Sequence, residues 1–562
     1  MSPHAGVRVL AELDAVVFVE GRICDRVHWA SQAEEPPAPR WPDKNAWGAP
    51  CTVQRAADVT AALRGARDDH AVGKRAAVVA DARALLGARD TLEVLVKAKV
   101  GLVVHAVGAG GSAAREALAL ADLGLGVLFS AGPEDALDLT LIARRAAEDA
   151  GTPIVVVHEL PPALAVETVQ VPAEAGIADY VGAPSQRLKS QGESTRSLGS
   201  VARLKQEERI PFALGSAMRD LEPHTGRRHD VVERVLRDDA EIVVFGAGAA
   251  GDSALAVAEQ LRDAGASVAA VRLVALRPYP GPRVVKALSR AHVVCVLEPG
   301  HQPLAQSGPL AAELKAAFAD AMTWATGYPG VGRLPRVVSC AADSGDLESA
   351  HVALALASVA EQGERGVRSM TFVPGAVATA HPRSSSRVVV RALVGSVAVA
   401  EACAPQVCEL VSRATGLHVA ATARRLGDDA ALDVVVARER PRAGMAPLAL
   451  DAVMAQSSAL LERTAPLAGL VEGALVLVGS KGNVPPSPAL LFEDRGARVV
   501  SSPLPTAKGD EATKQLVAAT CGVTCAAAVR IARAPIEAAE LDRLATELLG
   551  GKSGAIARAA MG

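Results

Sequence analysis

Three glycines near the middle of the chain have the spacing that binds nucleotides in many enzymes. Gly246, Gly248 and Gly251 stand in "VVFGAGAAGDSA" and fit G-x-G-x-x-G between an expected strand and an expected helix. In dinucleotide-binding folds such glycines make a tight turn and let the pyrophosphate approach the helix N-terminus. The motif therefore suggests one hypothesis, an NAD(P)-binding dehydrogenase.

The residues after the glycine motif do not complete a ribose pocket. A dinucleotide site places an acidic residue at the end of the second strand, about 20 residues further on. Here the second strand is "SVAAVRL", Arg272 stands near its end, and the proline turn "VALRPYPG" follows. An arginine suits a 2′-phosphate, but the proline turn does not resemble a ribose pocket. The glycines are therefore interpreted as turn geometry.

The cysteines and histidines predict no metal or cluster site. None of the eight cysteines forms C-x-x-C, and the close pairs "CAPQVC" and "CGVTC" lack the spacing of a ferredoxin cluster or a zinc knuckle. His224 and His229 in "HTGRRH" match a metal site poorly. We expect buried thiols and no iron–sulfur cluster in this chain.

Apolar runs alternate with helical patterns from the N-terminal part of the chain onward. The runs "RAAVVA", "VGLVVHAV", "LGVLFS" and "TPIVVVHE" are typical of parallel strands buried on both faces. Between the last two, the sequence predicts a helix from Pro133, with Ser130 as its cap and Gly151 as its stop. Alternation of this kind predicts an α/β fold built on parallel sheets.

The same alternation continues in two further blocks. The second has the strands "EIVVF", "SVAAVRL", "HVVCVLE" and "PRVVSC", and the third has "RVVVRAL", "LHVAATA", "LDVVVARE" and "ALVLVGS", with helices expected between them. We predict three successive domains, at 1–220 with a polar linker near 181–200, at 221–365 and at 385–562.

Composition limits the class of protein. Half of the 562 residues are apolar, which allows large cores, and a net charge of -3 argues against a general nucleic-acid binder. The N-terminus lacks the basic head and apolar core of a secretory signal, and no uncharged stretch is long enough to span a bilayer. We expect a cytoplasmic protein that binds neither nucleic acid nor membrane.

The middle block resembles the transketolase C-terminal type of domain, in which "VRLVALRPYPG" and "VLEPGHQPLAQSGPL" follow the glycine turn in the same order. The stretches "PEDALDLTLIARRAAEDAGTPIVVVHE" and "EPHTGRRHDVVERVLRDDAEIVVFGAG" resemble the first domain and the join to the second in pyruvate:ferredoxin oxidoreductases and other 2-oxoacid:acceptor oxidoreductases. The stretch "DAVMAQSSALLERTAPLAGLVEGALVLVGS" is similar to their γ domain.

This resemblance implies three domains: a thiamine-enzyme pyrimidine-type (α) domain, a transketolase C-terminal-like domain and a γ domain. The implied activity is oxidative decarboxylation of a pyruvate-type 2-oxoacid with thiamine diphosphate. The sequence lacks both the β part, which holds the cofactor's phosphates through a G-D-G…N motif, and the cysteine-rich ferredoxin domain. The implied partners are a β-type thiamine-binding subunit, a ferredoxin-like subunit or both, in an oligomer.

The family's functional residues are replaced at the matching positions. Its thiamine-activating glutamate aligns with Ala56, and Asp58 is the candidate to replace that carboxylate if a gap is allowed. Its T-A-R motif aligns with "HAV", which puts Val107 where an arginine would bind the substrate carboxylate in two contacts. Its γ-domain glycine loop is reduced to "RALVGSVAVAEA", which leaves Gly395 and Ser396 as candidates for cofactor binding.

Three hypotheses follow. The chain is a working subunit of a 2-oxoacid:ferredoxin oxidoreductase-like complex, completed by a β partner. Alternatively, it is a catalytically inactive α/γ homologue that serves as a scaffold or regulatory subunit, since a retained fold does not imply a retained function. The third hypothesis is the dehydrogenase built on the glycine motif.

Overall fold

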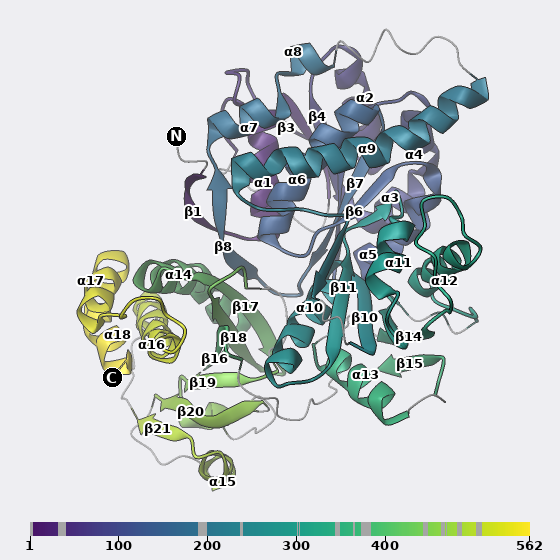
Figure 1. Ribbon diagram of the computed structural model, residues 1–562. Helices are drawn as coiled ribbons and strands as arrows, with labels where there is room; N and C mark the ends of the chain where they lie inside the picture. Colours follow the sequence, from purple (N-terminus) through teal and green to yellow (C-terminus); the bar gives the residue numbers. More distant parts are fainter. Residues whose placement is uncertain are drawn as a thin grey trace.

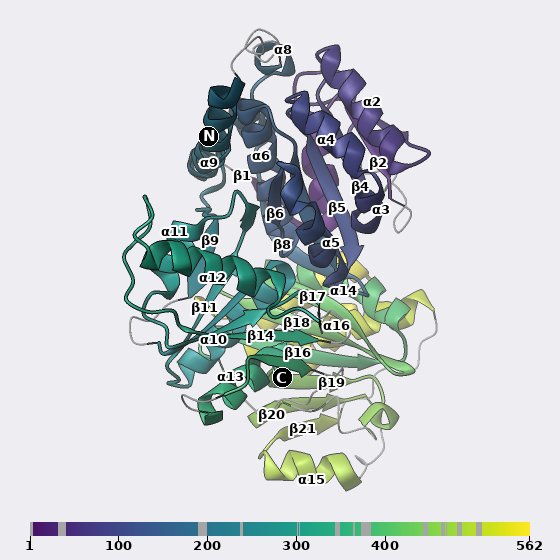
Figure 2. The ribbon, with the colours of Figure 1, turned by 90° about the vertical axis from the view of Figure 1, so that its right-hand side faces the viewer.

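The computed structural model of the protein describes residues 4–31, 41–188, 199–235, 240–300, 302, 304–342, 349–362, 366–372, 384–441, 448–461, 467, 469–479, 486–501 and 509–561. These residues form three sheets with helices packed on them (Figures 1 and 2). The predicted α/β class is confirmed. Part of the predicted polar linker, residues 189–198, lies outside the described residues.

The first sheet has seven strands, and the runs predicted as parallel strands form its centre. Val78 and Val104 face one layer of helices while Val79 and Val103 face the other, which explains why these strands are apolar throughout. In sheet order the strands are β12 (Ala275–Arg277), β6 (Gly126–Phe129), β7 (Ile154–Leu160), β5 (Val103–Ala109), β4 (Ala76–Asp81), β2 (Arg26–Ala30) and β3 (Thr52–Arg55).

Two layers of helices cover the first sheet. The predicted helix α6 begins at Pro133, but its N-cap is Gly132, with φ of 140°, rather than Ser130. Gly151 ends the helix in the left-handed conformation, as predicted. One layer holds α1 (Glu12–Ile23), α6 (Pro133–Ala150), α7 (Glu174–Val181) and α9 (Gly199–Thr225); the other holds α2 (Val59–Ala71), α3 (Ala82–Gly87), α4 (Arg89–Lys97), α5 (Ser112–Leu120) and the 3₁₀ turn η1 (Ala121–Leu123), while α8 (Pro184–Arg187) follows α7.

The second sheet has six strands, and its core is continuous with that of the first. Phe245 and Phe318 of the second block lie in the same apolar cluster as Val104 and Leu120 of the first. The strands are β15 (Ser369–Phe372), β14 (Arg336–Ala342), β13 (Val293–Leu297), β10 (Ile242–Ala247), β11 (Val268–Leu273) and the antiparallel β9 (Val232–Val235); the helices are α10 (Gly248–Asp263), α11 (Gly281–Leu288), α12 (Pro309–Met322) and α13 (Ser349–Gln362).

The third sheet has eight strands and mixes both directions of pairing. The sequence predicted a helix between β17 and β18, and this was wrong: Gly427, with φ of 70°, and Asp428 join the two strands in a hairpin. The strands are β1 (His4–Leu10), β8 (Ala165–Pro172), β17 (His418–Leu426), β18 (Asp429–Ala437), β16 (Arg387–Val394), β19 (Leu450–Ala455), β20 (Leu470–Val478) and β21 (Arg498–Ser501). One face carries α14 (Val397–Thr415), α16 (Asp510–Ala528), α17 (Ala538–Leu549) and α18 (Ser553–Met561); α15 (Pro486–Asp494) and the 3₁₀ turn η3 (Ser458–Leu461) pack on the other.

The three sheets exchange strands across the predicted domain boundaries. β1 and β8, from the N-terminal block, pair with each other, and β8 also pairs with β17, so both extend the third sheet. β12, from the middle block, pairs with β6 at the edge of the first sheet. The N-terminal block therefore completes the third sheet, and the middle block completes the first. Within the described residues, no helix has both the length and the apolar character that crossing a bilayer demands.

Candidate functional site

The glycine motif lies where β10 turns into α10, and a carboxylate from the first block fills it. The Ala249 N–H donates to Glu159 Oε2 at 2.8 Å. Glu159 stands at the carboxyl end of β7 in the first sheet. Gly248, with φ of 56°, is the position where a side-chain carbon would collide with that same oxygen. The helix N-terminus, the usual place for a phosphate, holds a carboxylate of the chain itself.

The other two glycines bring the strand and the helix into contact. A Cβ at Gly246 would lie 3.1 Å from the Gly251 Cα, and a Cβ at Gly251 would lie 2.8 Å from the Gly246 carbonyl oxygen. Any side chain at either position would push α10 off β10. All three glycines therefore have a structural reason for being glycine.

Arg272, the residue considered for a 2′-phosphate, is buried in ion pairs. Its side chain is 1% exposed, and Nη1 lies 2.9 Å from Glu233 Oε2 and 3.4 Å from Asp252 Oδ1. Its Nη2 pairs with Asp135 of α6. The guanidinium thus links the second block to the first.

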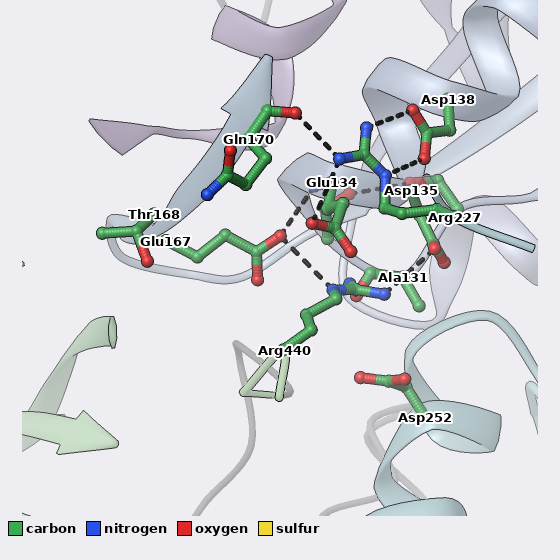
Figure 3. Close-up of polar contacts among 12 residues, drawn as sticks. Ala131, Glu134, Asp135, Asp138, Glu167, Thr168, Gln170, Arg227, Asp252 and Arg440 are labelled. Atoms are coloured by element: carbon green, nitrogen blue, oxygen red, sulfur yellow. Dashed lines mark hydrogen bonds and ion pairs between the residues drawn. The ribbon is translucent and has the colours of Figure 1, made fainter. Parts of the chain in front are cut away.

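Asp135 is shared by arginines from the two other blocks. Arg440, which follows β18 of the third block, donates from Nη1 to Asp135 Oδ1 at 3.0 Å and from Nη2 to the Ala131 carbonyl at 3.0 Å. Figure 3 shows Arg440 between the loop before α6 and the first turn of α10, where Asp252 lies. One carboxylate in the first turn of α6 therefore ties all three blocks together.

Further ion pairs surround this contact on the side of β8. Glu167 Oε1 accepts the Glu134 N–H at 2.6 Å and lies 3.5 Å from Arg440 Nε. Arg227 pairs with both oxygens of Asp138, at 2.5 and 2.6 Å, and donates to the Gln170 carbonyl at 2.8 Å (Figure 3). Glu167 and Gln170 belong to β8, so the network also fixes the strand that extends the third sheet.

The carboxyl groups of this network differ in their protonation state. Burial raises the pKa of Asp135, but Arg272 and Arg440 outweigh burial and hold it below its usual range. Burial also opposes ionisation of Asp138, yet Arg227 and His229 lower its pKa to about 2. For Glu167 burial prevails: despite Arg440, its pKa rises to about 8, with the Glu134 carboxylate adding to the rise. At neutral pH Asp135 and Asp138 are therefore ionised, whereas Glu167 is largely protonated.

The three aligned positions of the first block lie apart from this network. Ala56 follows β3 and donates its N–H to the Trp29 carbonyl at 2.9 Å. Asp58 is exposed and caps α2, because its Oδ1 accepts the Ala61 N–H at 2.7 Å. Val107 lies within β5 and is 1% exposed. These positions thus carry a methyl group, a carboxylate engaged at a helix N-terminus and a buried isopropyl group.

A groove of about 380 Å³ opens beside Ala56, and it contains a histidine–aspartate pair that sequence reasoning missed. His28 Nε2 lies 2.8 Å from Asp69 Oδ2, and Arg26 Nη1 donates to Asp69 Oδ1 at 2.9 Å. The His28 ring lies against Gly65 of α2, where a Cβ would come within 2.6 Å of its Cε1. The two residues are far apart in the sequence, so no local pattern indicated the pair.

In the third block, Gly395 and Ser396 lie where β16 turns into α14. Ser396 caps the helix through its Oγ, which accepts the Val399 N–H at 3.4 Å, and the exposed Gly395 N–H faces Gln456 Oε1 at 3.3 Å. The turn is therefore held by ordinary capping contacts. Cofactor binding by these two residues stays a prediction.

The described part of the chain contains no group of three or more His, Cys, Asp or Glu side chains that could hold a metal ion. Seven cysteines are buried, and burial raises the pKa of thiols such as Cys403 to about 12.

His229, for which the sequence offered no role, lies 2.9 Å from Asp138 in the ion network.

Comparison with known proteins identifies relatives of parts of the chain. Residues 240–334 match the family model described as pyruvate:ferredoxin oxidoreductase core domain II. The pyruvate synthase subunit PorA of Methanothermobacter thermautotrophicus is 24% identical over 198 residues, which are 33% of this chain and 52% of that protein. The match spans about half the length of this curated relative.

Two solved structures are similar to the chain. A 2-oxoglutarate:ferredoxin oxidoreductase from Magnetococcus marinus, solved with 2-oxoglutarate, coenzyme A and succinyl-CoA, is 17% identical with a TM-score of 0.43, over 59% of this chain and 62% of that one. A split-gene transketolase, an inactive beta4 tetramer, is 15% identical with a TM-score of 0.36, over 62% of this chain and 93% of that one.

Replacement of Gly248 tests the contact with Glu159. We expect Gly248→Ala to lower the free energy of unfolding by about 1 kcal/mol more than Gly496→Ala, because the added carbon moves the Glu159 carboxylate away from the Ala249 N–H. Gly496 is the matched control: its φ is also 56°, and a Cβ there meets no atom within 4 Å, so it carries only the backbone cost of about 1–2 kcal/mol. Equal losses in denaturant unfolding would contradict the contact.

Loss of Arg440 tests the network. We expect Arg440→Ala to cost about 3–5 kcal/mol, because it leaves the buried Asp135 with one arginine fewer. Arg438→Ala is the control, since Arg438 donates to a neutral carbonyl, that of Ile531, at 2.8 Å. If both variants unfold at the same denaturant concentration, the ion network does not hold the blocks together.

Glu167 predicts a pH dependence of stability. A carboxyl whose pKa rises from 4.5 to about 8 on folding takes up a proton, so the stability it contributes is present below pH 4.5 and is lost as pH rises through 8. We expect Glu167→Gln, whose amide cannot titrate, to unfold with a flatter pH profile between these values. The exposed Glu493→Gln should keep the profile of the unmodified protein; a shared profile in all three proteins would refute the assignment.

Proposed function

We propose that the chain serves as one subunit of a 2-oxoacid:ferredoxin oxidoreductase-like complex in the cytoplasm, because residues 240–334 match the core domain II model and the chain is similar to a pyruvate synthase subunit. In this proposal a separate β-type subunit binds thiamine diphosphate, and the complex oxidatively decarboxylates a pyruvate-type 2-oxoacid and passes the electrons to a ferredoxin-like subunit. The observation that carries the proposal is the core domain II match at residues 240–334.

Within such a complex, the geometry favours a scaffold or regulatory role for this chain. When bound, thiamine diphosphate supplies the carbanion chemistry, and the protein must supply a carboxylate to activate it. Ala56 offers a methyl group, and the nearby Asp58 carboxylate is engaged in capping α2. Val107 offers no charge for a substrate carboxylate. These residues do not fit the two roles, so no catalytic step is assigned to them.

The dehydrogenase alternative requires two rearrangements that the contacts oppose. A pyrophosphate at the glycine motif would have to displace Glu159 from the Ala249 N–H. A 2′-phosphate would have to draw Arg272 out of its pairs with Asp135, Glu233 and Asp252. If saturating NAD(P)H raises the Tm nonetheless, a nucleotide site exists and this alternative returns.

The proposal is tested by assembly and by one substitution. We expect the chain to co-purify with a β-type subunit that carries an intact G-D-G…N motif. We further expect Asp58→Asn to leave any 2-oxoacid-dependent reduction of a low-potential acceptor unchanged, because asparagine caps a helix as well as aspartate does. Asp58→Ala, which should cost about 1 kcal/mol of stability, separates loss of the cap from loss of the carboxylate.

The possible outcomes are distinct. Failure to associate with the β-type subunit overturns the subunit proposal. Association with turnover that Asp58→Asn abolishes, at unchanged Tm, would make Asp58 the activating carboxylate and overturn the scaffold role.

A further inference from the structure

Four buried side chains form a continuous line through the layer between the first sheet and α1. His158 Nδ1 lies 2.9 Å from Glu12 Oε1, His158 Nε2 lies 3.0 Å from His105 Nδ1, and His105 Nε2 lies 3.0 Å from Glu20 Oε1. We propose that this line is a proton-binding site, which holds one proton more than two neutral imidazoles carry and thereby links the stability of the first block to pH.

The line is closed to water. His105, His158 and Glu20 are each 0% exposed, and Glu12 is 7% exposed. His105 lies on β5 and His158 on the neighbouring β7, with their rings tilted by 33° and their centroids 5.2 Å apart. Because solvent cannot satisfy these atoms, each polar contact must be a hydrogen bond within the line.

The three contacts fix the number of protons that the line holds. Each of the three contacts joins two lone-pair atoms, so each requires one proton between them. Two neutral imidazoles bring two protons, one each. The third proton must therefore be additional: it makes an imidazolium of the histidine pair, or it protonates a carboxyl at an end of the line.

The end at Glu20 cannot take the additional proton. Arg144 Nη2 lies 3.2 and 3.1 Å from the two Glu20 oxygens, and the Cys24 thiol donates to Oε2 at 2.9 Å. Burial opposes ionisation of Glu20, but Arg144 and His105 outweigh it and lower the pKa to about 2. The additional proton is left to the histidine pair and Glu12.

The additional proton also balances the buried charge. The charged groups that face the pair are Glu12 and Glu20 from α1 and Arg144 from α6, while the Cys24 thiol is neutral because burial raises its pKa well above the usual value. Two carboxylates against one guanidinium leave one negative charge, which one proton cancels. The neighbouring Arg75 and Glu148 pair with each other at 2.6 Å.

Burial lowers the pKa of His105 although Glu20 counteracts it, so the additional proton lies at the contact between His158 and Glu12. The sign of the pH effect follows. Unfolded histidines release their protons near pH 6.5, whereas the folded line keeps one above that value. The stability from this proton is present below about pH 6.5 and is lost as pH rises through the pKa of the folded line.

Glu12→Gln is the decisive variant, because a glutamine amide supplies the third proton permanently. Its N–H donates to His158 Nδ1, and the two neutral imidazoles satisfy the other contacts, so folding takes up no proton. We expect the unfolding equilibrium constant of the unmodified protein to rise up to tenfold more per pH unit above pH 7 than that of Glu12→Gln. Glu93→Gln, on the exposed face of α4, should match the unmodified protein.

A spectroscopic measurement keeps the proposal testable if Glu12→Gln does not fold. The full-length protein is labelled with ¹⁵N-histidine and measured at pH 7.5. We expect either one imidazolium in the His105–His158 pair, or two neutral rings with a protonated Glu12 that donates to His158. Two neutral rings with an ionised Glu12, or equal pH slopes for the unmodified protein and Glu12→Gln, would overturn the proposal.

Discussion

A carboxylate taken out of water costs several kcal/mol unless its partners are buried with it. Asp135 meets this constraint only when three parts of the chain come together, because its two arginines, Arg272 and Arg440, belong to the second and third blocks. The arrangement of the blocks is therefore specified by charge as well as by apolar area. The exchanged strands β8 and β12 strengthen the same arrangement through backbone hydrogen bonds.

Three helices in the described part of the chain begin against a carboxyl group from outside the helix, in or next to a strand. Glu167 accepts an N–H from the first turn of α6, and Glu159 accepts one from that of α10. Glu298, directly after β13, accepts the Leu310 and Ala311 N–H groups of α12 at 3.1 and 2.9 Å. The free N–H groups of a helix N-terminus donate to an acceptor oxygen whatever its source. In α10 this general device occupies a glycine motif whose spacing is that of a nucleotide site.

The sequence predicted the elements that local patterns determine. The runs of valine became the parallel strands of the first two sheets, and Pro133 and Gly151 bounded α6 as predicted. Pairing between distant segments left no local pattern, so the placement of β1 and β8 in the third sheet was not predicted. The polar residues that matter most were single departures from apolar runs: one histidine in "VVHAV" and "HE" at the end of "TPIVVVHE". Such departures indicate a buried partner, but only the fold reveals which one.

The position of β8 has a consequence for the synthesis of the protein. β8 pairs with β1 as soon as the N-terminal block has emerged, but its other edge waits for β17, which begins only at His418. Until then the growing chain carries an open sheet edge, the kind of surface through which nascent polypeptides associate wrongly. Glu167 lies on that edge. While exposed to water it is ionised, and a foreign strand would have to bury this charge without an arginine partner. Glu167 thus stabilises the position of β8 in the folded protein and disfavours wrong pairing of β8 before β17 is made.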